Sequence, residues 1–275
     1  MKLTIGFSPC PNDTFILDAM LHGKIDCEGL VFDIVMEDVE TLNRFALNSI
    51  LDISKLSYHA YAYVSENYQL LLSGSALGSG CGPLLISKDE IPLSQVEYCV
   101  IGIPGKFTTA NLLLSIAFPD ALTKKEMIFS SIEKALLNGE IDAGAIIHEN
   151  RFTYEKKGLR KIMDLGAYWE KNYAAPIPLG GIAIKRSVER NVQEKVNRVL
   201  RRSIEFALQD PAESLQYVLA HASEMDREIV QQHIDLYVNN FTIDLGEEGK
   251  HAVEKLYEIA SGKKIIPSLH YPVFI

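Results

Sequence analysis

The chain has 275 residues, enough for one large or two modest domains with a buried core. Its composition, 47% hydrophobic and 23% charged, is that of an ordinary globular protein, and a formal net charge of -9 argues against binding to nucleic acid or to a membrane surface. The net charge does not exclude a small anionic ligand, because the local charge in a cleft can oppose the net charge. The apolar start of the chain breaks at Ser8 and no stretch reaches the length of a membrane span, so we expect a cytoplasmic protein.

Strand and helix signals alternate in the N-terminal part of the chain. We expect strands at 3–7, 30–36 and 51–54, and helices at 14–22, 39–48 and 58–66. This alternation predicts a largely parallel sheet with helices on its faces.

A second cycle of the same kind follows. We expect strands at 99–103, 126–129, 142–147 and 159–163, and helices at 109–118, 132–138 and 149–157. After residue 186 the pattern changes to amphipathic helices, at 189–208, 211–221, 226–237 and 249–260. The apolar tail at 265–275 is expected to pack against a lobe or a partner subunit, which leaves a homodimer open.

Two apolar strands, 83–87 and 179–184, bracket the second cycle and are natural crossovers between two lobes. The first lobe would then be discontinuous, over residues 1–90 and 179–275, and the second would hold residues 91–178. This layout resembles the type II periplasmic-binding-protein fold, an α/β architecture with two lobes and a ligand cleft between them. Such a likeness says nothing of the chemistry, which has to come from the site.

Ligands of open parallel sheets bind beyond the carboxyl ends of the strands, close to helix N-termini. The first such junction is Ser-Pro-Cys-Pro-Asn-Asp-Thr-Phe at 8–15. Two prolines stiffen it, and Asn12 or Asp13 can cap the following helix. A rigid capped loop and a polar wall of a binding site are both open for this segment, and so is the role of Cys10.

A second junction, at 52–58, brings Lys55 and Ser57 to the end of a strand. Lys55 could pair with a ligand carboxylate and Ser57 could add a hydrogen bond. The alternative is a surface lysine followed by a serine N-cap. The glycine-rich stretch at 74–83 lacks the pattern of a dinucleotide site and is interpreted as a flexible turn before a crossover strand.

The junction at 102–110 contains Gly-Lys but is no P-loop, because Phe107 stands where that motif needs Ser or Thr. What remains is a tight turn and a helix start that offers hydroxyl and N–H groups, at Thr108, Thr109 and Ala110, to a carboxylate or hydroxyl. The alternative is a plain threonine cap.

An apolar strand at 142–147 ends directly in His148. A histidine in this position is partly buried, rigidly placed and able to titrate near neutrality, as a general base must be. A structural histidine is the alternative, and the other six histidines lie in helical stretches or in the tail. The four cysteines and the histidines lack metal-site spacing and no Gly-x-Ser-x-Gly elbow is present, so we expect neither a metal nor a nucleophilic serine.

Together, these segments resemble the 1,4-dihydroxy-6-naphthoate synthase family of the futalosine route to menaquinone. The likeness covers essentially the whole chain, and it rests on the motifs at 8–15, 52–57, 105–111 and 146–154. It implies a cofactor-independent lyase that cleaves cyclic dehypoxanthine futalosine to 1,4-dihydroxy-6-naphthoate and dihydroxyacetone.

The resemblance also implies roles for single residues. The proton acceptor of the family falls on His148, and its substrate-binding stretches fall on Lys55, Leu56 and Ser57 and on Thr109 and Ala110. Reasoning from the residues adds Thr108 and, in the first junction, Asn12. Two alternatives are a small-molecule solute receptor of the same fold and a sister enzyme of the chorismate dehydratase type.

Overall fold

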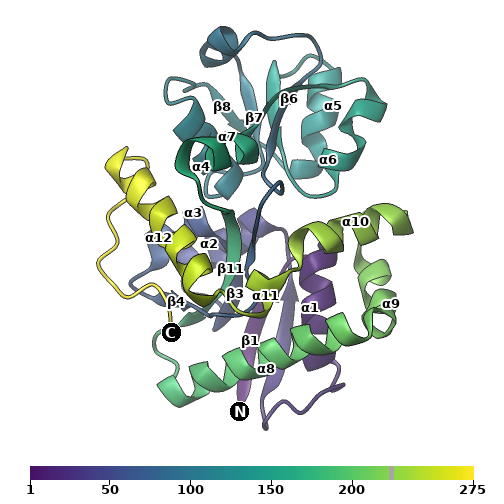
Figure 1. Cartoon of the computed structure of the whole chain (residues 1–275), viewed down its shortest axis with the longest axis vertical. Coiled ribbons are helices and arrows are strands. Elements are labelled where there is room, and N and C mark those ends of the chain that lie inside the picture. Colours follow the sequence, from purple (N-terminus) through teal and green to yellow (C-terminus); the bar gives the residue numbers. More distant parts are fainter. Residues whose placement is uncertain (223–225) are drawn as a thin grey trace.

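The computed structural model describes residues 1–222 and 226–275, which fold into two lobes, each built on its own sheet (Figure 1). The sheet of the first lobe has the strand order β2-β1-β3-β11-β4, with β5 beside β11. Its strands are β1 (Lys2–Phe7), β2 (Val31–Met36), β3 (Ile53–Ser57), β4 (Tyr68–Leu70), β5 (Ala76–Gly78) and β11 (Ile177–Lys185). The helices that follow its first three strands are α1 (Pro11–Leu21), α2 (Val39–Leu47) and α3 (Tyr58–Val64).

The second lobe contains the sheet β10-β6-β9-β7-β8. Its strands are β6 (Leu84–Ser87), β7 (Ile101–Ile103), β8 (Lys124–Glu126), β9 (Ala143–Ile146) and β10 (Arg160–Asp164). Its α-helices are α4 (Thr109–Ala117), α5 (Ile132–Leu137), α6 (Asn150–Thr153) and α7 (Leu165–Tyr173). The strand β6 falls within the range 1–90 expected for the first lobe, yet it pairs with β9 and β10 of the second sheet. The lobe boundaries as a whole stay a prediction.

Both sheets are mixed, so the expectation of largely parallel sheets is wrong. In the first sheet β1 runs parallel to β2 and β3, but β11 runs antiparallel to β3, β4 and β5. In the second sheet β6 is likewise antiparallel to β9 and β10. The crossover strands cause this, because the chain enters one lobe through β6 and returns to the other through β11, against the direction of the neighbouring strands.

The structure differs from the expected elements at several places, three of which concern the bounds of an expected strand or helix. The strand expected at 126–129 is observed earlier in the chain, as β8 at Lys124–Glu126, and a 3-10 turn, Phe129–Ser131, follows it. The helix expected at 149–157 is short, because α6 gives way to a second 3-10 turn, Tyr154–Lys157. The helix α1 begins at Pro11 rather than at residue 14, since proline is well suited to the first helical position.

The helix α7 was not expected at all. Asp164 caps it, accepting hydrogen bonds from the N–H groups of Gly166 and Ala167 at 2.9 Å each. Gly166 lies against Gly82, where a Cβ atom would stand only 2.3 Å from the Gly166 Cα. A glycine just inside a helix weakens the helical pattern in the sequence, but here it allows two backbone segments to touch.

Five helices of the C-terminal part complete the first lobe (Figure 1). They are α8 (Arg190–Gln209), α9 (Pro211–His221), α10 (Arg227–Tyr237), α11 (Asn240–Ile243) and α12 (Gly246–Gly262). The apolar face of α8 packs on α1, where Ser203 Oγ donates to the carbonyl of Ile16 at 2.7 Å. The tail packs on the same lobe, since Leu70 N donates to the carbonyl of Val273 at 2.9 Å.

The largest hydrophobic cluster runs through both lobes. It includes Leu56 and Tyr58 of the first lobe and Leu85 and Ile101 of the second. The lobes therefore share a buried apolar contact beside the cleft. Over residues 1–222 and 226–275, no helix is long and apolar enough to cross a membrane.

Candidate active site

A cleft of about 660 Å³, counted with its open mouth, lies where residues of both lobes meet. All eight residues that the sequence analysis proposed for the site border it: Asn12, Lys55, Leu56, Ser57, Thr108, Thr109, Ala110 and His148. Its wall also contains residues that the sequence analysis did not propose as site residues, among them Asp13, Cys81, Pro83, Gly180, His233 and Tyr237. The structure thus brings the junctions of the two lobes to one cavity.

The start of α1 forms one wall of this cleft. Cys10 is the N-cap residue and makes no side-chain cap, so neither Asn12 nor Asp13 caps the helix as expected; both lie in its first turn. Asp13 is only 2% exposed, and its carboxylate turns back to accept hydrogen bonds from Ser8 Oγ at 2.7 Å and from Asn12 Nδ2 at 2.8 Å. The first turn of the helix is therefore held by side chains of the motif itself.

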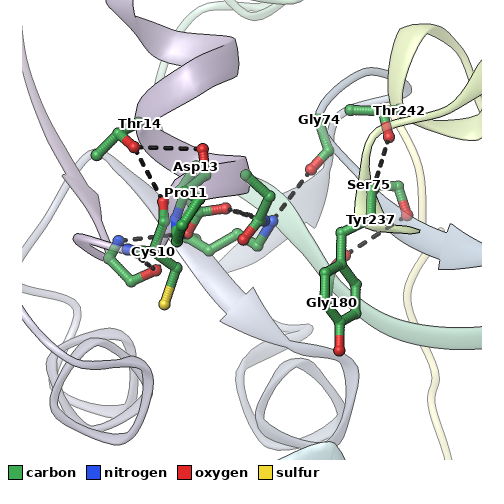
Figure 2. Close-up of polar contacts among 12 residues, drawn as sticks. Cys10, Pro11, Asp13, Thr14, Gly74, Ser75, Gly180, Tyr237 and Thr242 are labelled. Atoms are coloured by element: carbon green, nitrogen blue, oxygen red, sulfur yellow. Dashed lines mark hydrogen bonds and ion pairs between the residues drawn. The ribbon is translucent and has the colours of Figure 1, made fainter. Parts of the chain in front are cut away.

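Lys55 completes this buried group. Its Nζ lies 2.9 Å from Asp13 Oδ1 and donates to the carbonyl of Gly74 at 3.3 Å. The two charged side chains are 8% and 3% exposed, so Lys55 is no surface lysine, and the carboxylate it faces in the structure is that of Asp13. In Figure 2 the sulfur of Cys10 points away from this polar group.

His148 follows β9 after one intervening residue and reaches the cleft from the second lobe. Its backbone has a φ of 58°, a left-handed conformation that histidine tolerates better than most residues. Cys10 Sγ of the first lobe lies 3.4 Å from its Nδ1, and the ring of Phe129 packs edge-on at 5.1 Å. The imidazole is therefore held between both lobes.

Burial lowers the pKa of His148 below its ordinary value, although the carboxylates of Glu149 and Asp13 act in the opposite direction. The imidazole thus favours its neutral form, which can accept a proton. Burial raises the pKa of the neighbouring Cys10 thiol, so the thiol stays protonated near neutral pH.

A second histidine lies parallel to the first. The rings of His148 and His233 are stacked with centroids 6.1 Å apart and an interplanar angle of 19°. His233 belongs to α10, is fully buried, and lies 2.9 Å from Asn12 Oδ1 through its Nε2. The sequence analysis did not propose His233, because it interprets histidines in helices as structural. The sequence signal for its burial was its position on the apolar face of α10, with Val230, Ile234 and Tyr237.

Three hydroxyl groups of the predicted site already have partners. Ser57 ends β3, and its Oγ accepts from Asn43 Nδ2 at 3.2 Å instead of capping α3. Thr108 Oγ1 caps α4 by accepting from Asn111 N at 3.3 Å. Thr109 Oγ1 donates to the carbonyl of Leu179 at 2.5 Å, which ties the start of α4 to β11. For Thr108, the plain cap weighed in the sequence analysis is thus observed.

The turn before α4 packs against α2 of the first lobe. Glu40, 8% exposed, accepts a hydrogen bond from Phe107 N at 3.1 Å, and burial raises the pKa of its carboxyl group. Gly105 has a φ of 144°, and a Cβ atom there would meet the Glu40 carboxylate at 2.5 Å. This contact between the lobes requires glycine.

Replacement of Gly105 by alanine is therefore expected to reduce the free energy of unfolding by about 1–3 kcal/mol, through backbone strain and displacement of Glu40. Chemical denaturation measures the change. Gly262→Ala is the matched control, because nothing lies within 4 Å of the added carbon; it should change stability by less than about 1 kcal/mol. Equal stability of wild type and Gly105→Ala would contradict the proposed packing.

Known proteins resemble this chain over its whole length. A family model described as menaquinone biosynthesis matches residues 3–262. A 1,4-dihydroxy-6-naphthoate synthase of Thermus thermophilus is 42% identical over 99% of both chains. One of Streptomyces coelicolor is 38% identical over 97% of this chain and 95% of its own. The chain belongs to the menaquinone-biosynthesis family of 1,4-dihydroxy-6-naphthoate synthases. The resemblance stated from the motifs is confirmed.

Solved structures place this family member among periplasmic-binding-protein-like folds, as predicted. A protein of Archaeoglobus fulgidus has a TM-score of 0.91 at 39% identity and covers 96% of this chain and 98% of its own. The alkanesulfonate-binding protein of Xanthomonas axonopodis pv. citri has a TM-score of 0.72 at 13% identity, with 97% and 94% coverage. The latter likeness shows the fold alone.

Among residues 1–222 and 226–275, no group of three or more His, Cys, Asp or Glu side chains could hold a metal ion. The four cysteines are free thiols, and three of them, Cys10, Cys81 and Cys99, are buried. The polar groups of the cleft are instead hydrogen-bond donors and acceptors and one buried ion pair.

Proposed function

We propose that this chain cleaves cyclic dehypoxanthine futalosine to 1,4-dihydroxy-6-naphthoate and dihydroxyacetone, with His148 as general base. The observation that carries this proposal is the position of His148: it borders the cleft, it comes from the lobe opposite the Asp13–Lys55 pair, and burial favours its neutral form. A cytoplasmic location goes with a biosynthetic enzyme of this kind.

The chemistry asks little of the protein beyond orientation and proton transfer. The neutral imidazole of His148 removes the proton of a substrate hydroxyl. The resulting oxyanion becomes a carbonyl as the adjacent carbon–carbon bond breaks, and the electron pair of that bond passes to the ring that becomes the aromatic naphthoate. Aromatisation supplies the driving force, so no cofactor enters the proposed reaction.

The carboxylate of the substrate needs partners in the same cleft. The first N–H groups of a helix have no acceptor within it, and Thr109 and Ala110 begin α4 at the cleft wall. Lys55 Nζ contacts Asp13 and the carbonyl of Gly74 in the structure, and an ammonium has three donors. We therefore assign the substrate carboxylate to the start of α4, with the remaining donor of Lys55 directed to it or to a neighbouring hydroxyl.

Purified protein is expected to convert cyclic dehypoxanthine futalosine to the naphthoate and to release one three-carbon fragment for each naphthoate formed. Chromatography with mass detection measures both products. Chorismate, tested in parallel, should remain unchanged, whereas its dehydration would indicate the sister activity. Wild-type protein that binds the futalosine derivative tightly without product would indicate a solute receptor.

A further inference from the structure

His233 is a fully buried side chain that borders the cleft, and the proposed mechanism gives it no role. It lies on α10 of the first lobe, with its ring stacked at 6.1 Å on that of His148 and at 4.6 Å from that of Tyr237. A histidine buried this deeply is expected to have both ring nitrogens hydrogen-bonded.

The hydrogen-bond network determines which nitrogen of His233 carries the proton. Asp13 Oδ1 faces both the Lys55 ammonium and Asn12 Nδ2, at 2.9 and 2.8 Å, so the amide of Asn12 donates to this carboxylate. The other end of the amide, Oδ1, can only accept. His233 Nε2, 2.9 Å from that oxygen, must therefore be the donor.

The other nitrogen, Nδ1, is left without a partner. In the described part of the chain, five buried side-chain atoms have no hydrogen-bond partner, and they belong to His59, Asn111, Glu133, Ser214 and His233. Of these residues, only His233 borders the cleft. Burial lowers the pKa of His233 well below its ordinary value, and its interactions with His148 and with the Lys55 ammonium act in the same direction, so the ring is neutral and Nδ1 carries a lone pair.

We propose that His233 Nδ1 accepts a hydrogen bond from a hydroxyl group of the substrate's polyol part, beside the hydroxyl that His148 deprotonates. The Asp13–Asn12–His233 chain holds the imidazole in the tautomer that can only accept at this position. A substrate with one hydroxyl too few would leave this nitrogen unpartnered, so the contact selects a polyhydroxylated ligand. This inference rests on the proposed function and deepens it.

Two amide substitutions separate this role from a purely structural one. The amide of a glutamine at 233 reaches the position of Nε2, so His233→Gln keeps the bond to Asn12 and removes the acceptor at Nδ1. The amide of an asparagine reaches the position of Nδ1, so His233→Asn keeps an acceptor there and gives up the bond to Asn12. We expect kcat/KM to fall by about 10- to 100-fold in His233→Gln and by clearly less in His233→Asn. The reverse order would show that His233 serves only to hold Asn12, and would overturn the proposal.

A spectroscopic measurement tests the proton placement without turnover. In ¹⁵N NMR of wild-type protein, His233 Nδ1 is expected to show the shift of an unprotonated imidazole nitrogen. In His148→Ala, which is expected to turn the substrate over slowly, the same nitrogen should move toward the hydrogen-bonded range when cyclic dehypoxanthine futalosine is added. A protonated Nδ1, or an unprotonated one that does not respond to this ligand, overturns the inference. His251→Gln, at an exposed position of α12, is the control for activity and should match wild type.

These measurements also distinguish failure of the proposed function from failure of the inference about His233. Absence of naphthoate from wild-type protein refutes the proposed function, while the proton position at His233 is still decided by NMR. Normal naphthoate production by both wild type and His233→Gln refutes the inference alone.

Discussion

Replacing His148 by alanine is expected to lower kcat by about 10²- to 10⁴-fold, the usual contribution of a positioned general base. The fold should survive, because the side chain is not part of the apolar core and borders the cleft. Initial rates of naphthoate formation measure the effect, and circular dichroism checks the fold. His251→Gln, remote from the cleft on α12, should retain the wild-type rate. Full activity of His148→Ala would remove His148 from the mechanism.

The pH dependence of wild-type kcat/KM gives a second measure of the same residue. A general base acts in its neutral form, so activity is lost as the pH falls through the pKa of His148. Because burial lowers that pKa below the ordinary 6.5, the acid limb of the profile should lie below pH 6.5. An acid limb above pH 6.5 would contradict the assignment of the base or of its environment.

Replacing Lys55 by methionine is expected to reduce the free energy of unfolding by about 3–5 kcal/mol, because it leaves the buried carboxylate of Asp13 without its cation. Both side chains of this pair are less than a tenth exposed, at 8% and 3%, so their attraction is screened far less than that of a surface pair. Urea denaturation measures the loss. Turnover should fall as well, since Asp13 and Asn12 position the wall of the cleft.

Two further variants separate charge from packing at Lys55. The double variant Asp13→Asn/Lys55→Met removes both charges and should recover part of the lost stability. Lys2→Met removes one partner of an exposed pair, in which Lys2 Nζ lies 2.9 Å from Asp33 at 66% and 52% exposure, and should cost less than about 1 kcal/mol. Equal losses of unfolding free energy in Lys55→Met and Lys2→Met would show that the buried pair contributes no more to stability than the exposed one.

The strand-end reasoning predicted residues that border one cleft in the structure, but it could not give the contacts among them. His148 is predicted as a base because an apolar strand runs directly into it. Such a strand and its end can be recognised from neighbouring residues in the sequence alone. The ion pair of Lys55 with Asp13 joins β3 to α1. Two partners that lie in different elements, far apart in the sequence, leave no periodic pattern from which their contact could be predicted. The sequence therefore left a ligand carboxylate and a surface position open for Lys55, whereas the structure pairs it with the buried carboxylate of Asp13.

His233 and α7 show two other limits of sequence reasoning. In α10 the histidine sits among apolar residues of a helix, where a structural role is the usual one, and only the three-dimensional contact with Asn12 and His148 marks it as part of the cleft. In α7, Gly166 obscures the helical pattern because its role is tertiary: it allows contact with Gly82. The mixed sheets could not be predicted for a similar reason, because the direction of β6 and β11 depends on the path of the chain between the lobes.

Cys10 Sγ of the first lobe lies 3.4 Å from Nδ1 of His148, the proposed general base, which belongs to the second lobe. Because the two residues belong to different lobes, the base and the polar wall of α1 are in register only while the lobes are together. A change in the distance between the lobes would therefore also change the distance between His148 and the Asp13–Lys55 pair.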